Sequence, residues 1–318
     1  MSRLRVVFMG TPEFSVPTLE TLIRETDVVA VYTQPDRPVG RGLKLQPSPI
    51  KALATSHGIP VFTPERVSTP DEVARIRALA PDFSVVVAYG QILKPEVIGI
   101  PKYGTINIHS SLLPRWRGAA PIQWSILSGD RETGITTMMI VPKLDAGDIL
   151  LQETTPISDE DTAESVHDRL SAMGARLILP TLEGLKAGTV SPRPQDESRV
   201  TYAKKLVKEM EQLDWKGSVR QLDLQVRGLY PWPGSRIETT DGVRIKIKKG
   251  KIASVSVGGE AGTLQEHFGR LVLKCGEGVY EILELQEEGK KSISAGEYLN
   301  GMRGRGVSLP MTLKGSST

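Results

Sequence analysis

The chain has 318 residues and a formal net charge of +3, with 39% hydrophobic and 24% charged residues. This length favours two domains, and this balance is typical of a folded globular protein rather than a disordered one. No apolar run approaches the roughly 20 residues needed to cross a bilayer, so no membrane partner is expected.

The cysteine and histidine content indicates the compartment of the protein and the kinds of site that it lacks. Cys275 is the single cysteine, which excludes an internal disulfide and indicates a reducing compartment, so we expect a cytoplasmic protein. The four histidines lie far apart and show no metal-ligand spacing, so we expect no metal site. Nothing in the sequence requires more than a monomer.

The first part of the chain, residues 1–187, alternates between strand-like and helix-like runs. We interpret its charged, then apolar start as a strand ending at a Gly10-Thr11-Pro12 turn, because a signal peptide would need a small-residue cleavage site. The pattern predicts a Rossmann-like α/β domain with a doubly wound, mostly parallel sheet, whose ligands bind at the carboxyl ends of the strands. The expected strands span 5–10, 28–33, 59–63, 82–88, 104–109 and 135–141, and the expected helices span 17–25, 49–57 and 70–80.

The pattern changes near residue 188. Residues 188–205 are rich in proline, polar and charged residues and are interpreted as a linker. Residues 206–318 carry 17 basic and 14 acidic side chains, which accounts for the whole net charge and indicates a surface that attracts a polyanion. A helix at 214–229 and short strands at 236–239, 243–248, 251–257, 270–274 and 279–285 predict a small OB-like β-barrel.

The expected strand 104–109 ends in polar residues. Asn107 and His109 face the same side of a strand, because side chains alternate. An amide donor beside a proton-transfer group suits a reaction through a tetrahedral oxyanion. The structural alternative is that both side chains cap the strand and bind a neighbouring loop.

Two loops supply further candidates. Residues 110–121 follow the polar strand end and hold two hydroxyls, a proline and two arginines around a tryptophan, where an α/β domain builds its pocket. The loop at 143–148 holds Asp145 and Asp148, either of which is an ordinary turn residue or a partner that fixes the His109 ring. Sequence spacing alone does not bring them together.

Basic residues gather in two places. Arg37, Arg41 and Lys44 lie in a long Pro/Gly-rich stretch at 34–51, which is either a solvated loop or an arm that grips phosphates. The second run holds Arg244, Lys246, Lys248, Lys249 and Lys251 with no acidic residue. It either protects an exposed sheet edge or follows a phosphate backbone. The first strand is not followed by G-x-G-x-x-G, which disfavours a nicotinamide cofactor.

An ordered set of motifs resembles the folate-dependent formyltransferase family over nearly the whole chain. A lone N-x-H pattern would be weak, but these segments form a specific set. They are Val6–Glu20, Thr33–Gly42, Ala88–Leu93, Ile106–Trp124, Leu144–Leu150 and Leu229–Ser235.

The resemblance implies roles for individual residues. Asn107, His109 and Asp145 match the family's catalytic trio. The matches to the folate-binding segment are Ser111, Leu112, Leu113 and Pro114, and those to the stretch lining the pterin pocket are Tyr89, Gly90, Gln91, Ile92 and Leu93. The implied contacts to tRNA or its methionine are Phe14, Arg37, Arg41, Lys44, Arg244, Lys246, Lys248 and Lys249.

The implied activity is transfer of a formyl group from 10-formyltetrahydrofolate, a co-substrate, to the amino group of methionine on initiator tRNA. Glycinamide ribonucleotide formyltransferases, another branch, usually have a histidine shortly before the catalytic aspartate loop, where this chain has Thr136-Thr137-Met138. They also lack a C-terminal barrel of this kind, so both differences favour the tRNA branch. Two alternatives remain: a formyltransferase for a small amine such as a nucleotide-linked sugar, and an RNA-binding protein without catalysis.

Overall fold

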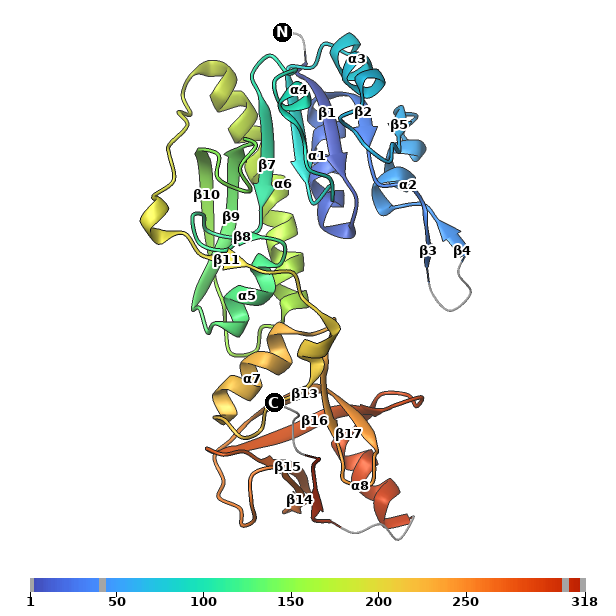
Figure 1. Cartoon of the computed structure of the whole chain (residues 1–318), viewed down its shortest axis with the longest axis vertical. Helices are drawn as coiled ribbons and strands as arrows, with labels where there is room; N and C mark the ends of the chain where they lie inside the picture. Colours follow the sequence, from blue (N-terminus) through green and yellow to red (C-terminus); the bar gives the residue numbers. More distant parts are fainter. Residues whose placement is uncertain (1–2, 40–43, 305–308, 315–318) are drawn as a thin grey trace. The chain divides into compact units, whose positions relative to one another are not determined.

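A computed structural model describes residues 3–39, 44–304 and 309–314 of the chain (Figure 1). The chain divides into two compact units. The first unit holds residues 1–121, 132–156 and 167–203, and the second holds residues 122–131, 157–166 and 204–318. Two short segments from the N-terminal part of the chain therefore belong to the C-terminal unit, which the sequence pattern does not indicate.

A seven-stranded sheet forms the centre of the first unit in the part of the chain that the structure describes. Its strand order is β10-β9-β7-β6-β1-β2-β5. All pairs from β5 to β7 are parallel, whereas β9 runs antiparallel to β7 and to β10. The strands are β1 (Arg5–Gly10), β2 (Asp27–Tyr32), β5 (Val61–Phe62), β6 (Phe83–Val87), β7 (Thr105–His109), β9 (Glu132–Met139) and β10 (Ile149–Pro156).

Helices cover both faces of this sheet, which confirms the predicted doubly wound α/β fold. On one face, Ile76 of α3 and Val97 of α4 join a buried cluster with Val7 and Met9 of β1. On the other face, Gly174 of α6 lies against Ile108 of β7. The helices in this part of the chain are α1 (Val16–Glu25), α2 (Pro49–Ser56), α3 (Pro70–Ala78), α4 (Pro95–Ile98), α5 (Pro121–Leu127) and α6 (Ala163–Ala187), with the 3-10 turn η1 (Glu13–Ser15).

Residues 188–203 are ordered against the first unit rather than forming an extended spacer. The short strand β11 (Tyr202–Ala203) pairs in parallel with β8 (Arg117–Gly118), and the 3-10 turn η2 (Glu197–Arg199) precedes it. A second small pair joins β3 (Arg37–Val39) to β4 (Lys44–Gln46). The strand β8 lies in the loop that the sequence singles out at 110–121.

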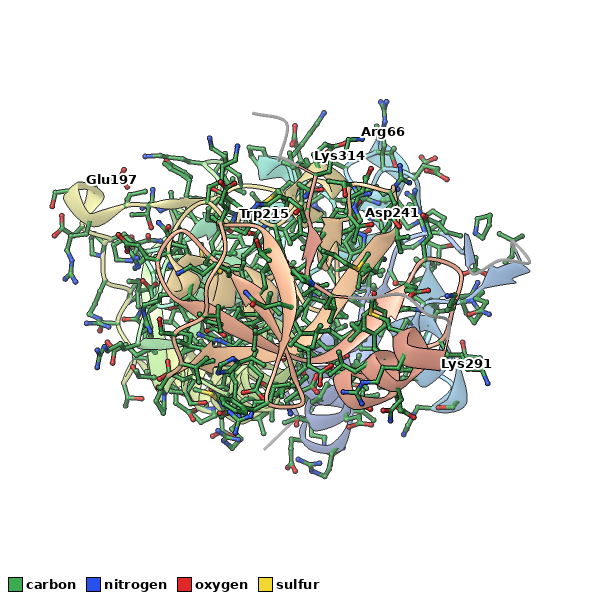
Figure 2. All side chains as sticks on the ribbon, turned by 90° about the horizontal axis from the view of Figure 1, so that it is seen from below. Arg66, Glu197, Trp215, Asp241, Lys291 and Lys314 are labelled. Carbon is green, nitrogen blue, oxygen red and sulfur yellow. The ribbon has the colours of Figure 1, made fainter. Side chains whose placement is uncertain are left out.

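The second unit is built on a curled antiparallel sheet, in agreement with the predicted OB-like β-rich fold. Within the described residues its strand order is β12-β13-β16-β15-β14-β18, and β17 pairs with β16. Trp215, labelled in Figure 2, lies in the core of this unit. The elements are η3 (Lys208–Glu211), α7 (Val219–Gly228), β12 (Ser235–Glu238), β13 (Arg244–Ala253), β14 (Thr263–His267), β15 (Arg270–Lys274), β16 (Val279–Glu287), β17 (Ile293–Ser294), α8 (Ala295–Gly304) and β18 (Met311–Thr312).

Three predicted elements of this unit are wrong in their bounds. The strands expected at 243–248 and 251–257 are one strand, β13, because two register shifts against β16 between Ile247 and Gly250 bend it without breaking the ladder. The helix expected from residue 214 begins at Val219, because Ser218 caps it in a reciprocal capping box with Gln221.

The side chain of the single cysteine is part of the hydrophobic core. Cys275 is fully buried in the core of the second unit, and burial raises its pKa to about 11. It therefore remains a protonated core side chain at neutral pH.

Candidate functional site

His109 is the best-enclosed member of the predicted trio. It ends β7, is 6% exposed, and its Nε2 lies 2.9 Å from the carbonyl oxygen of Trp116. A carbonyl only accepts, so Nε2 carries a proton and donates it to Trp116. Nδ1 is therefore the ring nitrogen left to act on another group.

The structure brings Asp145 to this nitrogen. Asp145 Oδ2 lies 3.8 Å from His109 Nδ1, too far for a direct hydrogen bond but close enough for one polar atom to contact both. Asn107 lies two residues before His109 on the same face of β7, is half-buried, and its carboxamide has no partner among the described residues. The three predicted side chains therefore share one region of the first unit.

The loop between β9 and β10 reaches this region by folding back over its own strand. Asp145 adopts φ of 45°, a left-handed conformation uncommon outside glycine. The N–H of Gly118 donates to Asp145 Oδ2 over 2.8 Å, which fixes the carboxylate. A Cβ added to Gly147 would lie 1.8 Å from the carbonyl oxygen of Met139, so the close approach of the loop requires glycine there.

Replacing Gly147 with alanine is expected to destabilise the first unit by about 1–3 kcal/mol, because the added methyl must displace backbone. Chemical denaturation followed by circular dichroism measures this change. Gly258→Ala is the matched control, since nothing lies within 4 Å of a Cβ built there. Equal unfolding midpoints for the two variants would contradict the close packing of the loop.

The predicted folate segment follows directly from β7. Ser111 is fully buried, and its hydroxyl donates to the carbonyl of Arg115 over 2.6 Å. Leu113 packs with Met138 and Ile149, which leaves the half-buried Leu112 and Pro114 with surface to offer a ligand. The Leu113–Pro114 peptide bond is cis.

The predicted pterin stretch divides into structural and available residues. Tyr89 and Leu93 are buried in the sheet core, and Gln91 holds the preceding loop through Val67 N at 2.8 Å and Pro64 O at 2.9 Å. Gly90 is exposed with φ of 86°, and Ile92 is 86% exposed. Gly90 and Ile92, and the half-buried Leu112 and Pro114, therefore keep surface that the fold itself does not cover.

Two side chains form a hydrogen-bonded platform that supports the predicted folate segment, and the sequence patterns assign no role to either of them. Thr136 Oγ1 donates to the carbonyl of Ser111 over 2.7 Å and accepts from Leu113 N over 3.1 Å. Gln152 Nε2 donates to Thr136 Oγ1 and to the carbonyl of Leu113. The cross-strand pairing of Thr136 with His109 is the signal that could have identified it. Gln152 carries no comparable pattern.

The other residues predicted to contact tRNA or its methionine lie in separate segments of the chain. Phe14 is 7% exposed and stands edge-on to His167, so its ring is largely enclosed. Arg37 is in β3, Arg41 lies outside the described residues, and Lys44 begins β4 with its side chain likewise outside the description.

The basic run of the second unit lies on β13. Arg244 is paired with Glu238 at 3.5 Å and Glu288 at 3.6 Å. Lys248 Nζ lies 5.8 Å from the centre of the Tyr230 ring. Lys246 and Lys249 are exposed and form no ion pair with a described residue. Among the four basic residues predicted here, the three lysines are therefore freer than Arg244 to pair with another charged group.

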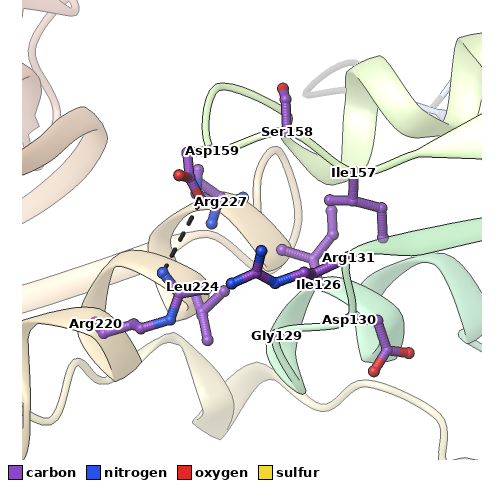
Figure 3. A pocket seen from close by; sticks show the side chains of 10 residues that line it. All are labelled: Ile126, Gly129, Asp130, Arg131, Ile157, Ser158, Asp159, Arg220, Leu224 and Arg227. Carbon is purple, nitrogen blue, oxygen red and sulfur yellow. Dashed lines mark ion pairs between the residues drawn. The ribbon is translucent and has the colours of Figure 1, made fainter.

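A separate cavity of about 310 Å³ lies wholly in the second unit (Figure 3). Three arginines line it, but Arg220 is 3.9 Å from Asp159 and Arg227 is 2.8 Å from Asp223. Two of the three charges are thus already balanced within the unit. None of the predicted site residues lines this cavity.

The described residues contain no helix that is long and apolar enough to span a membrane. In the same ranges, no group of three His, Cys, Asp or Glu side chains is arranged to hold a metal ion.

Comparisons with known proteins place both parts of the chain. A family described as formyl transferase matches residues 4–182, and one described as formyl transferase, C-terminal domain, matches residues 205–303. A methionyl-tRNA formyltransferase of Geobacter sulfurreducens is 50% identical over 308 residues, 95% of each chain. That of Methylococcus capsulatus is 48% identical over 298 residues, covering 93% of this chain and 96% of the relative.

Solved structures agree at the level of the fold. A sugar 3N-formyl transferase, WlaRD, superposes with a TM-score of 0.66 at 19% identity, over 92% of this chain and all of that one. HypX of Aquifex aeolicus, solved with tetrahydrofolic acid, gives a TM-score of 0.62 at 18% identity over 99% of this chain and 51% of that chain.

Proposed function

This chain belongs to the methionyl-tRNA formyltransferases of the formyl transferase family, and we propose that Asn107, His109 and Asp145 carry out the family's chemistry here. The reaction moves a formyl group from 10-formyltetrahydrofolate to the amino group of methionine on initiator tRNA. The observation that carries the proposal is the 3.8 Å approach of Asp145 to His109 Nδ1 beside Asn107 on the same strand face.

The chemistry defines what each side chain must do. The neutral amine nitrogen bonds to the formyl carbon, the carbonyl becomes an oxyanion, and the bond from that carbon to the donor nitrogen then breaks. Asn107 Nδ2 and a proton on His109 Nδ1 donate to the oxyanion. Asp145, directly or through one water, takes the proton that the attacking amine loses and returns it to the departing nitrogen.

His109 and Asp145 also support one another. The Trp116 carbonyl fixes the proton on Nε2, so any second ring proton sits on Nδ1, facing Asp145. The Asp145 carboxylate stabilises the resulting positive charge. Its hydrogen bond from Gly118 keeps it oriented without consuming its second oxygen.

The formyl donor is proposed to lie along Ser111–Pro114 and Tyr89–Leu93. The platform formed by Thr136 and Gln152 holds the first segment from below, and Gln91 holds the second. The residues that hold the donor are then Gly90, Ile92, Leu112 and Pro114, while the buried Tyr89, Leu93 and Leu113 support them.

A transfer assay with labelled 10-formyltetrahydrofolate tests the function. We expect label on initiator methionyl-tRNA, and at least about 1000-fold less efficient transfer to free methionine or a nucleotide-linked amino sugar, because remote binding contacts contribute to catalysis. Preferred transfer to the amino sugar would support the small-amine alternative. Binding of tRNA without folate-dependent transfer would support the non-catalytic one.

The C-terminal part of the second unit, residues 206–318, is proposed to bind tRNA through Lys246, Lys248 and Lys249 of β13. Replacing Lys246, Lys248 and Lys249 together with alanine is expected to lower the slope of log Kd against log salt by up to about 3, because each lysine that pairs with a phosphate contributes about 1 to the slope. Fluorescence titrations at several salt concentrations measure the slope.

The matched control replaces Lys251, Lys290 and Lys314, which are already paired with Glu281, Glu287 and Glu238. It removes the same formal charge from the same unit but should change the slope by less. Identical slopes in the two triple variants would show that Lys246, Lys248 and Lys249 do not pair with tRNA phosphates.

A further inference from the structure

The segment 193–203 is fastened to both loops that surround His109. Arg193 and Ile149 exchange backbone hydrogen bonds of 2.8 and 2.9 Å, immediately after the Asp145 loop. Thr201 accepts from Trp116 N through its hydroxyl and from Arg117 N through its carbonyl, both over 2.9 Å. A stretch that resembles a spacer by composition is therefore part of the scaffold of the site.

Gln195 makes the most direct contact from this segment. Its Nε2 donates to the carbonyl oxygens of Asp145 at 2.8 Å and Gly147 at 2.7 Å. Its Oε1 accepts from Nε and Nη2 of Arg117 at 3.0 and 2.9 Å. One carboxamide thus joins the backbone of the Asp145 loop to the loop that follows Trp116.

Arg117 extends this hydrogen-bond network from Gln195 to Glu197. Its side chain is fully buried, and Nη2 also donates to Glu197 Oε1 over 2.8 Å. Glu197, labelled on η2 in Figure 2, additionally accepts from Lys143. Hydrogen bonds from Arg117 and then Lys143 lower the pKa of Glu197 to about 2, so it stays charged across the neutral range.

We infer that Gln195 and Arg117 are positioning residues that hold Asp145 at its distance from His109. Gln195 holds the Asp145 main chain, while Gly118, the neighbour of Arg117, holds its carboxylate. Asp145 needs this support because its backbone occupies the left-handed region at φ of 45°. This inference rests on the catalytic role proposed for Asp145.

Gln195→Glu separates positioning from general stability. The new carboxylate keeps an acceptor for Arg117 and strengthens that contact, but its second oxygen meets two carbonyl oxygens where Nε2 donated. We expect kcat to fall at least about 10-fold through misplacement of Asp145, with both KM values changing less than about 3-fold. Arg199→Ala, an exposed position in the same segment, should keep the wild-type kcat.

A double-mutant cycle with Asp145→Asn gives the decisive readout. If Gln195 acts through Asp145, Gln195→Glu should cost little more once Asp145 is already replaced. Equal losses in both backgrounds, or an unchanged kcat for Gln195→Glu alone, would overturn the positioning role. A wild-type rate for Asp145→Asn would instead overturn the proposed catalytic role. If Gln195→Glu does not fold, Gln195→Met replaces it, since it keeps length and removes both hydrogen-bonding groups.

Discussion

The His109→Ala variant is expected to transfer the formyl group about 100–1000-fold more slowly than the wild type, because it removes one preorganised donor to the oxyanion. The imidazole is held by the Trp116 carbonyl on one side and faces Asp145 on the other, so alanine cannot replace its proton. The loss should appear in kcat more than in the KM of either substrate, since the oxyanion exists only after attack.

The control for this variant is His57→Ala. His57 is exposed, and its Nδ1 contacts only Leu53 and Ser56 of its own helix end among the described residues. Its replacement should leave kcat within about 2-fold of the wild type, as is usual for a surface substitution. Comparable rates for the two variants, each with a native circular dichroism spectrum, would remove His109 from the mechanism.

Asp145→Asn should lower kcat by about 100–10,000-fold, the range expected for loss of a general base. Asparagine has the same shape and can still accept from Gly118 N, so the loop should remain folded. It cannot take the amine proton or balance a positive charge on His109. The Asp145→Asn variant therefore tests the role of the negative charge while it leaves the packing nearly unchanged.

Asp148 is the matched control, because without the family resemblance the residue pattern does not decide between the two carboxylates of this loop. The structure favours Asp145, because its Oδ2 lies 3.8 Å from His109 Nδ1, whereas Asp148 forms no ion pair with His109 among the described residues. Asp148→Asn should keep kcat within about 3-fold of the wild type. If the larger loss follows Asp148 instead, the assignment of the base is wrong.

Local patterns predicted most of the sheet because buried parallel strands are short and continuous in apolar residues. The strand at Arg5–Gly10 has the expected bounds. In the antiparallel sheet of the second unit, the strand at Arg270–Lys274 also has its expected bounds. The alternation of side chains along a strand also predicts that Asn107 and His109 share one face. The sequence pattern did not predict that β13 is a single strand, because its charged, bulged centre resembles a turn.

Interactions between distant segments account for what the sequence could not predict. The meeting of Asp145 with His109 requires a loop to fold back over β9, and only Gly147 hints at that approach. Gln195 gave no signal at all, since it lies in a stretch whose proline and polar content favours a linker. Its role depends on two carbonyls and one guanidinium brought together by the fold.

Single-turnover formyl transfer by Asn107→Ala, with both substrates saturating, tests the central claim most directly. Asn107 is half-buried and its carboxamide has no partner among the described residues, so its removal should leave the fold intact. The mechanism predicts a rate about 100–1000-fold below that of the wild type, with unchanged affinity for the formyl donor. A rate within about 3-fold of the wild type would contradict this claim, because Asn107 would then not stabilise the transition state.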